Sequence, residues 1–379
     1  MTSFICAAGP RSLHSGILEY NQTVKAWDVV IVGGGVIGLS LAWRIKREGL
    51  TVLVIDKGEP GREASYAAGG MIAHCDPHLP NVLRPLAFAS AAMYPDFARE
   101  LQEESGESSD LRDQGAYAVF SEDEQPVCAG ARRLTTREID QLEPLLNLKA
   151  PAYWLPERSV DPRALCSALV KAAKQRGVDF ATGSAATEVG IKNGRAAGVK
   201  TTHSTYAAGV VVNCAGAWAS QLQPLGLPTR PAKGQMVCVV PAPEDTSHAP
   251  LVQHVVRTRD VYIIPRSDRR VLLGATLEDA GFDKRTDADT VEKLYRAAAE
   301  VVPKIRGMRI HDAWAGLRPA SPDGLPILGE TLRPGYYAAT GHFRDGIMLA
   351  PITAEVMTNL IVGRESGFDS RPFSPLRFA

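Results

Sequence analysis

The sequence lacks several features that mark particular classes of protein. Its 42 Lys and Arg residues are balanced by 42 Asp and Glu residues, and its pI is near 7.1. No field of one sign is therefore available to gather phosphates, which argues against a nucleic-acid or anionic-membrane partner. The longest uncharged, mostly apolar run covers residues 29–43, shorter than the roughly 18 residues that a membrane helix needs. We expect no membrane span.

Cysteine is also scarce. Cys6, Cys75, Cys128, Cys166, Cys214 and Cys238 are scattered, and no two have the two-residue spacing of a metal or redox motif. We therefore expect no disulfide framework, no metal site and a cytoplasmic protein. Residues 1–25 lack the continuous apolar core of a secretory signal, so we interpret them as a disordered or appended N-terminus.

What remains is the composition of a soluble globular protein. The chain has 379 residues, of which 45% are hydrophobic and 22% charged, and this length suggests two domains with a sizeable core. A small-molecule substrate is the expected partner. The sequence leaves open whether the chain forms homo-oligomers.

Residues 27–56 have the pattern of a strand, a helix and a second strand. The run WDVVIV (27–32) is short and β-branched and stops at three glycines, which is typical of a buried parallel strand. Apolar residues recur at helical spacing over 36–48, before a candidate C-cap at Gly49. The run TVLVI (51–55) completes a βαβ unit that ends at Asp56.

Glycines between the first strand and the helix have dinucleotide-binding spacing. Gly33, Gly35 and Gly38 form G-x-G-x-x-G, in which the glycines permit a tight turn, close approach of a pyrophosphate and close helix packing. Asp56 follows at the end of the second strand, where a carboxylate binds ribose hydroxyls. The alternative is a glycine-rich turn that binds nothing.

The segment after Asp56 bears on whether the dinucleotide is NAD or FAD, which share this fingerprint. A polar, glycine-rich loop over 61–70 replaces a further crossover helix. Such a loop suits an extended FAD, with Arg62 neutralising the diphosphate and Ser65 donating a hydrogen bond. The alternative for Arg62 is a solvated surface residue.

Strand and helix patterns continue along the chain. We expect a helix over 161–176, strands over 210–214 and 336–339, and a helix beginning at Gly346. Residues 115–120 and the hairpin-like pair 261–264 and 271–273 suggest antiparallel strands. The predicted class is α/β (α+β overall): a discontinuous Rossmann-like FAD-binding domain (26–75, 156–235 and 311–379) and a substrate-binding domain with a largely antiparallel sheet (76–155 and 236–310).

Several longer motifs occur in a specific order. After the fingerprint and the loop over 62–74 come VVNCAGAWA (211–219), VYIIPR (261–266), AWAGLRPASPDGLPILG (313–329) and GHFRDGIMLAP (341–351). Together they resemble the glycine oxidase branch of the D-amino-acid oxidase family, over residues 27 to about 362.

The resemblance implies noncovalent FAD. Family members that attach flavin covalently carry a cysteine just after the arginine motif, where this chain has Ala320, Ser321 and Pro322. A helix that begins at Gly346 would also place its N-terminus at the flavin and stabilise negative charge there. The matching FAD-binding positions are Val36, Ile37, Asp56, Lys57, Glu63, Ala64, Ala68, Gly69, Gly70, Ala186, Gly216, His342, Phe343, Arg344, Asp345, Gly346, Ile347 and Met348.

Three residues match the amino-acid pocket of the family. Arg318 matches the arginine that binds the substrate carboxylate, a role suited to the planar guanidinium fork. Tyr262 matches the tyrosine that joins it, and Arg344 is the third candidate. The alternatives are an ordinary core tyrosine and an ion pair between Arg344 and Asp345. Asp260 would favour an amine-bearing substrate if it points inward, or else is a solvated acid.

The resemblance implies oxidation of glycine or another small amino acid. In this chemistry the α-hydrogen leaves as hydride to flavin N5 without the help of a general base. We therefore assign the role of general base to neither His74 nor His342. The imine hydrolyses to a 2-oxo acid and ammonia, and dioxygen becomes hydrogen peroxide. A role in forming the thiazole of thiamine is implied too. The alternatives are a sarcosine or other secondary-amine oxidase, a D-amino-acid dehydrogenase with a non-oxygen acceptor, and an FAD-binding protein without catalysis.

Overall fold

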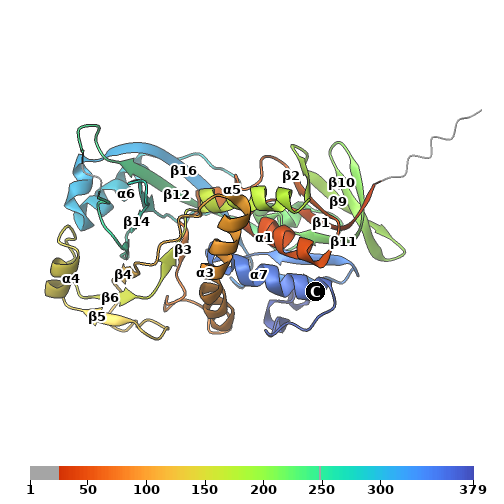
Figure 1. The fold of residues 1–379 in the computed structure, drawn as a ribbon, viewed down its shortest axis with the longest axis horizontal. Helices are drawn as coiled ribbons and strands as arrows, with labels where there is room; N and C mark the ends of the chain where they lie inside the picture. Colours follow the sequence, from red (N-terminus) through yellow and green to blue (C-terminus); the bar gives the residue numbers. More distant parts are fainter. Residues whose placement is uncertain (1–24, 247–248) are drawn as a thin grey trace, which may run out of the picture.

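The computed structural model of the protein describes residues 25–246 and 249–379. Two eight-stranded sheets dominate it, one at each end of an elongated molecule (Figure 1). This mixed architecture confirms the predicted fold class. The expected disordered or appended N-terminus covers residues 1–25, and all of these except Lys25 lie outside the described residues. No helix among the described residues is long and apolar enough to cross a membrane.

The first sheet contains the predicted βαβ unit. Six of its strands follow the order β17-β18-β11-β1-β2-β8, with every neighbouring pair parallel except β17 and β18. The strands are β1 (Ala26–Val32), β2 (Val52–Asp56), β8 (Asp179–Thr182), β11 (Thr205–Asn213), β17 (Ile327–Glu330) and β18 (Tyr336–Thr340). Strands β10 and β9 complete the sheet as an antiparallel branch from β11.

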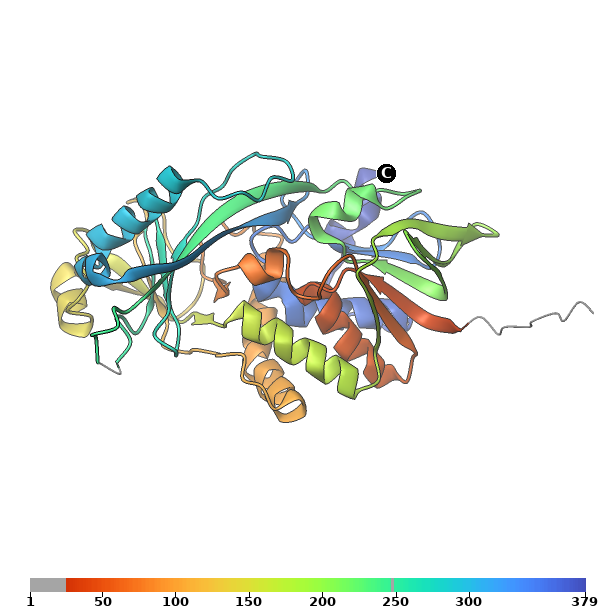
Figure 2. The same ribbon diagram turned by 90° about the horizontal axis from the view of Figure 1, so that it is seen from above.

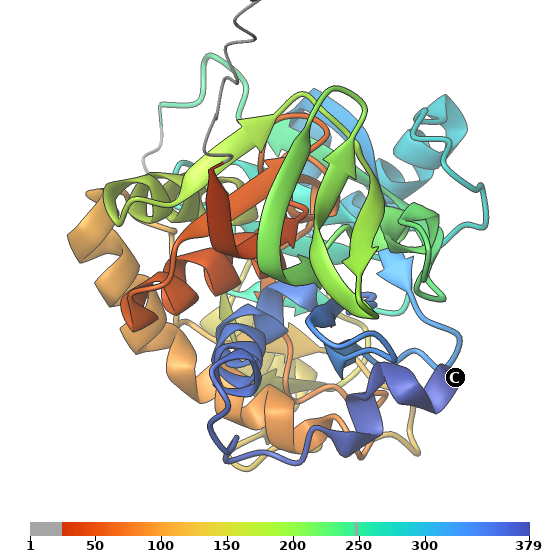
Figure 3. The same ribbon diagram turned by 90° about the vertical axis from the view of Figure 1, so that its right-hand side faces the viewer.

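Alternate residues of β1 and β2 pack against different layers because side chains alternate along a strand. Val29, Ile31 and Val54 pack with helices, whereas Val30 and Leu53 pack with a β-hairpin. Figure 3 shows the helices on one face of this sheet and the green hairpin on the other. The helices are α1 (Val36–Ile45), α3 (Arg84–Ser105), α5 (Pro162–Gln175) and α7 (Gly346–Ile361); the hairpin is β9 (Ala186–Lys192) and β10 (Arg195–Thr201).

The second sheet is largely antiparallel. Its order is β16-β12-β15-β14-β13-β4-β6-β5, and the predicted hairpin forms as β14 and β15. Its longest strands, β12 and β16, run from this sheet toward the first one (Figure 2). The strands are β4 (Ala116–Ala118), β5 (Arg132–Leu134), β6 (Ala152–Leu155), β12 (Arg230–Val240), β13 (Val255–Arg257), β14 (Tyr262–Pro265), β15 (Val271–Gly274) and β16 (Arg309–Ala320).

The two faces of this second sheet differ. Val237, Ile263 and Leu273 pack with α6 (Ala288–Val301) in one apolar cluster. Met236 and Ile264, on the other face, line a large cavity. The remaining short elements are α2 (Ala64–Ala67), β3 (Met71–Ile72), α4 (Thr136–Leu142) and β7 (Arg158–Ser159).

Domain boundaries remain a prediction, and three elements bear on them. Strands β12 and β16 pair along their whole length within the second sheet, although residues 230–235 and 311–320 were expected in the FAD-binding domain. Helix α3 packs with α1 and α7, although residues 76–155 were expected in the substrate domain. Because of β12, β16 and α3, no simple boundary separates the two predicted domains at these points.

Cysteine pairing corrects the sequence-based expectation. Cys75 and Cys128 form a disulfide across a sequence separation of 53 residues, so the prediction of no disulfide was wrong. The spacing of cysteines could not indicate this pair, because folding brings together two loops from distant parts of the chain. Cys166, Cys214 and Cys238 are free and buried. The disulfide also weakens the cysteine-based argument for a cytoplasmic protein.

Loss of the disulfide should lower stability. The double variant Cys75→Ser/Cys128→Ser releases a long loop of the unfolded chain, which typically costs roughly 2 to 4 kcal/mol. Urea unfolding of the wild type and the variant, each with and without dithiothreitol, measures this difference. Reductant should weaken the wild type only. Equal unfolding midpoints for oxidised wild type and double variant would count against a stabilising bond.

Candidate active site

A single cavity of about 660 Å³ connects the two sheets. At one end lie the glycine-rich turn after β1 and the end of β2. At the other lie the inner face of the antiparallel sheet and the N-terminus of α7. Nearly all of the residues predicted from the sequence to bind FAD or substrate line this one cavity. The folded chain therefore brings together motifs that are more than 300 residues apart.

The three fingerprint glycines have different surroundings. Gly33 has a φ of +108°, and a Cβ there would lie 2.3 Å from the Cys214 carbonyl oxygen. A Cβ on Gly38 would lie 2.0 Å from the Gly33 carbonyl oxygen, so this glycine packs helix on turn and does not line the cavity. Gly35 lines the cavity, and its nearest neighbour there would be Ser65 Oγ at 3.4 Å. Gly35 is therefore the position at which a ligand can approach the backbone.

Asp56 is held in place at the end of β2. Its two carboxylate oxygens accept hydrogen bonds from the Gly34 and Gly58 amides, each at 2.8 Å. Burial raises the pKa of Asp56, although both amide bonds lower it. The neighbouring Lys57 forms an ion pair with Glu63 at 3.0 Å, and its Nζ lies 3.2 Å from the centroid of the Trp218 ring. These groups build the end of the cavity where the sequence analysis expects the ribose.

Most, but not all, of the residues named in the loop after β2 line the cavity. Ala64, Ala68 and Gly69 line the cavity, as do Glu63 and Gly70. Ser65 also lines it, but its Oγ accepts a hydrogen bond from the Val36 amide at 2.9 Å and so caps α1. Arg62 does not line it. Its side chain forms an exposed ion pair with Glu59 at 3.0 Å, as the alternative interpretation stated.

Residues at the start of α7 form the opposite wall. His342, Phe343, Arg344, Asp345, Gly346 and Ile347 all line the cavity. Met348 is buried in the core instead, and its carbonyl accepts a hydrogen bond from Ser90 at 2.6 Å. Burial raises the pKa of Asp345 to about 6, while Arg344 acts to lower it. Within the described residues, no ion pair joins these two side chains.

Neither His342 nor His74 is well placed to act as a general base. His342 Nε2 lies 3.0 Å from Thr353 Oγ1 inside the core, and burial lowers the pKa of this imidazole to about 3. His74 does not line the cavity, its Nδ1 lies 3.3 Å from the Ile72 carbonyl oxygen, and burial lowers its pKa. Both observations agree with assigning no base.

The depressed pKa of His342 predicts how stability depends on pH. In the unfolded chain this histidine takes up a proton near pH 6.5, whereas the folded chain resists protonation until about pH 3. The stability it contributes is therefore present above pH 6.5 and is lost as the pH falls toward 3. Unfolding free energies from pH 8 to 4 should fall less steeply for His342→Gln than for the wild type. Parallel curves would contradict this.

Arg318 and Tyr262 face the cavity from the antiparallel sheet. Arg318 Nη1 donates to the carbonyl oxygens of Thr276 at 3.0 Å and Lys233 at 3.3 Å, and no carboxylate pairs with it among the described residues. Burial lowers the pKa of Arg318, and Tyr262 acts in the opposite direction. Gly234 makes room for the guanidinium, since a Cβ there would lie 2.3 Å from Arg318 Nη1. A partly buried cation that lines a cavity and has no acid partner is suited to bind a ligand carboxylate.

Several cavity residues were missed by the sequence analysis, and two of them are charged. Asp76 and Arg257 line the cavity near Tyr262, and Arg257 pairs with Tyr262 in the register of β13 and β14. The signal in the sequence was the hairpin spacing of VVRTRDVY (255–262), which places Arg257 and Tyr262 on one face. Trp218 was quoted only within a motif, yet it lines the cavity too. Asp260 is exposed and does not line it, which agrees with a solvated acid.

The cavity fits the extended shape of FAD. Asp56 suits the ribose, Gly35 and the first turn of α1 suit the pyrophosphate, and Ala186 and Gly216 line the wall between β9 and β11. A Cβ on Gly216 would meet nothing within 4 Å, so the space beside it is open. The N-terminus of α7 also lines the cavity, and a helix N-terminus could stabilise the negative charge of a reduced flavin held there.

Comparisons with known proteins agree with this geometry. The family model described as DAO, FAD dependent oxidoreductase, matches residues 28–360. Glycine oxidase of Pseudomonas putida is 34% identical over 363 residues, covering 92% of this chain and 98% of that protein. A bifunctional ThiO/ThiG protein of Trichormus variabilis is 33% identical over 350 residues, covering 89% of this chain and 53% of that protein. The crystal structure of glycine oxidase from Geobacillus kaustophilus superimposes with a TM-score of 0.85 at 34% identity, covering 92% and 98% of the two chains.

Proposed function

We propose that this chain, which belongs to the DAO family of FAD-dependent oxidoreductases, oxidatively deaminates glycine or another small amino acid. It is an FAD-dependent amino-acid oxidase of the glycine oxidase type. The observation that carries the choice of substrate is Arg318, a partly buried guanidinium that faces the cavity beside Tyr262 with no carboxylate partner among the described residues.

The protein's own residues bind and orient the substrate. Arg318 and the Tyr262 hydroxyl would hold its carboxylate, with Arg344 adding positive charge at the cavity wall. Holding one end of a small amino acid fixes the direction of its Cα–H bond, and orientation of this kind lowers the barrier substantially. Noncovalently bound FAD would supply the acceptor for the α-hydrogen as hydride and pass the electrons to dioxygen, which yields hydrogen peroxide. The imine product then hydrolyses to a 2-oxo acid and ammonia.

The positions of the histidines support a reaction without a protein base. His342 lines the cavity, but its Nε2 is engaged with Thr353 Oγ1 in the core, and His74 lies outside the cavity lining. His78 also lines the cavity, but its exposed ring is paired with Glu124. A substrate amine that arrives neutral needs no proton acceptor at the Cα–H bond. We further propose a cytoplasmic enzyme whose product serves thiazole formation for thiamine. The resemblance to a ThiO/ThiG protein supports this role.

Peroxide release on a small panel of amines tests the proposal. Glycine, sarcosine, D-alanine and D-proline are each incubated with the purified holoenzyme in air, and hydrogen peroxide is measured. We expect peroxide with glycine or D-alanine. Peroxide with sarcosine or D-proline only would favour a secondary-amine oxidase. Reduction of an artificial dye without any peroxide would favour a dehydrogenase and overturn the proposed oxidase.

A further inference from the structure

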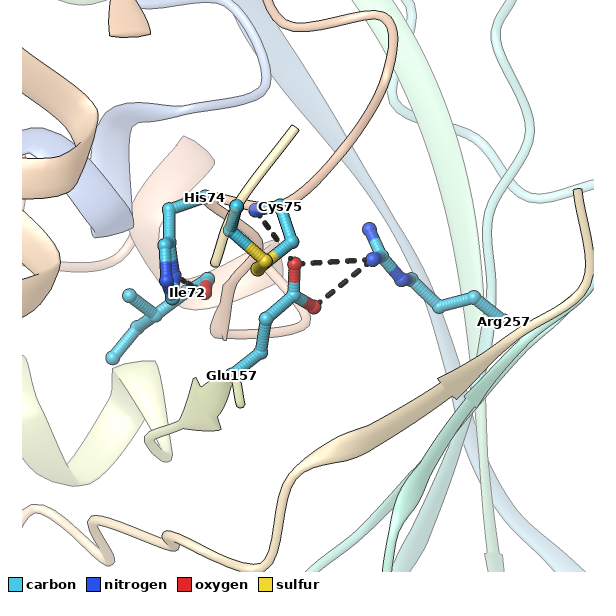
Figure 4. Close-up of a disulfide and its surroundings, with 6 residues drawn as sticks. Ile72, His74, Cys75, Glu157 and Arg257 are labelled. Carbon is cyan, nitrogen blue, oxygen red and sulfur yellow. Dashed lines mark hydrogen bonds and ion pairs between the residues drawn. A yellow bond between two sulfur atoms is a disulfide. The ribbon is translucent and has the colours of Figure 1, made fainter. Parts of the chain in front are cut away.

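An ion-pair cluster lies in the cavity wall beside the proposed carboxylate site. Arg257 Nη1 lies 3.2 Å from Asp76 Oδ2, and Arg257 Nη2 lies 2.9 Å from Glu157 Oε2. Figure 4 shows Glu157 between the disulfide and Arg257. The side chains of Arg257 and Glu157 are only 7% and 3% exposed, whereas that of Asp76 is 28% exposed. Asp76 and Arg257 line the cavity, and Glu157 lies behind them.

The cluster adjoins the residues that would hold the substrate carboxylate. Arg257 and Tyr262 are direct partners on β13 and β14, so their side chains leave the sheet on the same face. That face is the one lining the cavity, since Tyr262 and Arg257 both contribute to it. A substrate held by Arg318 and Tyr262 would therefore have the Asp76–Arg257 pair beside it.

Structural stability does not account for this arrangement. Glu157 alone balances the charge of Arg257, and it also accepts a hydrogen bond from the Cys75 amide at 2.9 Å. Asp76 adds a second carboxylate, and its charge acts with burial to raise the pKa of Glu157. Buried charges are costly to maintain and contribute little net stability. A second carboxylate on Arg257 that also lines the cavity therefore suggests a polar ligand there.

The acceptor is also fixed in position. Asp76 follows Cys75 directly, and the disulfide to Cys128 anchors that residue. The other carboxylate oxygen of Asp76 accepts a hydrogen bond from the His78 amide at 2.9 Å. A polar group held this firmly can discriminate between ligands, because it cannot move to accommodate the wrong one.

We propose that Asp76 and Arg257 form a second polar subsite, which binds a neutral hydrogen-bonding side chain of the amino-acid substrate. A carboxamide fits best, because its oxygen accepts from the guanidinium and its amino group donates to the carboxylate. A side-chain carboxylate would be repelled by Asp76, and a side-chain ammonium by Arg257. The inference rests on the proposed function, since it takes the substrate carboxylate to lie at Arg318. It extends the substrate class from glycine to small amino acids with an amide side chain.

Size-matched substrates test the subsite. Asparagine and leucine have similar shapes but differ in hydrogen bonding, so kcat/KM is measured for both, as D and L forms, together with aspartate and glycine. We expect one enantiomer of asparagine to exceed the same enantiomer of leucine and of aspartate by about tenfold or more. The Asp76→Ala variant should reduce the ratio of kcat/KM for asparagine to kcat/KM for leucine to near one. Asp260→Asn, an exposed acid outside the cavity, should leave it unchanged.

Ligand binding keeps this test separate from the test of the proposed function. Succinamate and 4-methylpentanoate are the deaminated counterparts of asparagine and leucine, and calorimetry with the holoenzyme gives their affinities without turnover. We expect succinamate to bind about tenfold more tightly than 4-methylpentanoate, and we expect Asp76→Ala to lose this difference. Such a result supports the subsite even if no amine is oxidised. Oxidation of glycine with equal kcat/KM for asparagine and leucine, or a ratio unaffected by Asp76→Ala, would overturn the subsite and leave the proposed function standing.

Discussion

Replacing Arg318 by methionine should lower kcat/KM for the amino-acid substrate by roughly 30-fold to several thousand-fold. Losing one partner of a buried charged pair typically costs about 2 to 5 kcal/mol, and each 1.36 kcal/mol is a factor of ten. Removing the Arg318 guanidinium should weaken the binding of carboxylates. It should leave FAD in place, because Arg318 lies on β16 of the antiparallel sheet, away from the glycine-rich turn. Steady-state kinetics and the flavin content of the purified variant measure the two effects separately.

A matched control exists on the same strand. Arg309→Met removes an exposed arginine at the other end of β16, and it should leave kcat/KM within about twofold of the wild type, as most surface substitutions do. Arg318→Lys should restore little of the lost kcat/KM, since an ammonium group lacks the planar fork of a guanidinium. If Arg318→Met bound and oxidised its substrate normally, the carboxylate would lie elsewhere in the cavity.

Replacing Gly35 by valine should produce a folded protein without FAD. Gly35 has a φ of −74° and a ψ of 178°, which valine adopts without strain, so the backbone tolerates the change. A Cβ there would meet nothing closer than Ser65 Oγ at 3.4 Å, and the rest of the valine side chain would project into the cavity. The flavin-to-protein absorbance ratio of the purified variant should fall to near zero, while its circular dichroism stays that of the wild type.

Two other glycines separate this effect from general damage. Gly58→Ala adds a Cβ that meets nothing within 4 Å, so this variant should keep both FAD and stability. Gly38→Ala places a Cβ 2.0 Å from the Gly33 carbonyl oxygen, so it should destabilise the fold itself. A Gly35→Val protein that retains a full complement of FAD would contradict the assignment of this turn to the pyrophosphate.

The elements that were predicted from the sequence are those with strong local patterns. The strand ending at Gly33 and the helix starting at Val36 could be predicted, because their apolar spacing and glycine punctuation depend only on neighbouring residues. The strand and turn around Asn213 and the start of α7 at Gly346 follow the same logic. Residues in such segments also made up most of the predicted site, and most of them line the cavity.

Features set by long-range packing could not be predicted in the same way. Helix α3 contains Pro95, which interrupts helical hydrogen bonding, and packing against α7 and α5 stabilises it. The Cys75–Cys128 disulfide joins two loops that only the fold brings together. Each depends on contacts that no local pattern encodes.

The most direct test of the central claim is anaerobic reduction of the purified holoenzyme by its substrate. The account predicts a yellow protein with the spectrum of oxidised flavin, which loses its visible absorbance when glycine or another small amino acid is added without oxygen, and regains it in air. Arg318→Met should keep the yellow colour and lose the bleaching at the same substrate concentration. A wild-type protein that purifies with nicotinamide or without any flavin, or a flavin that no amino acid reduces, would contradict the account.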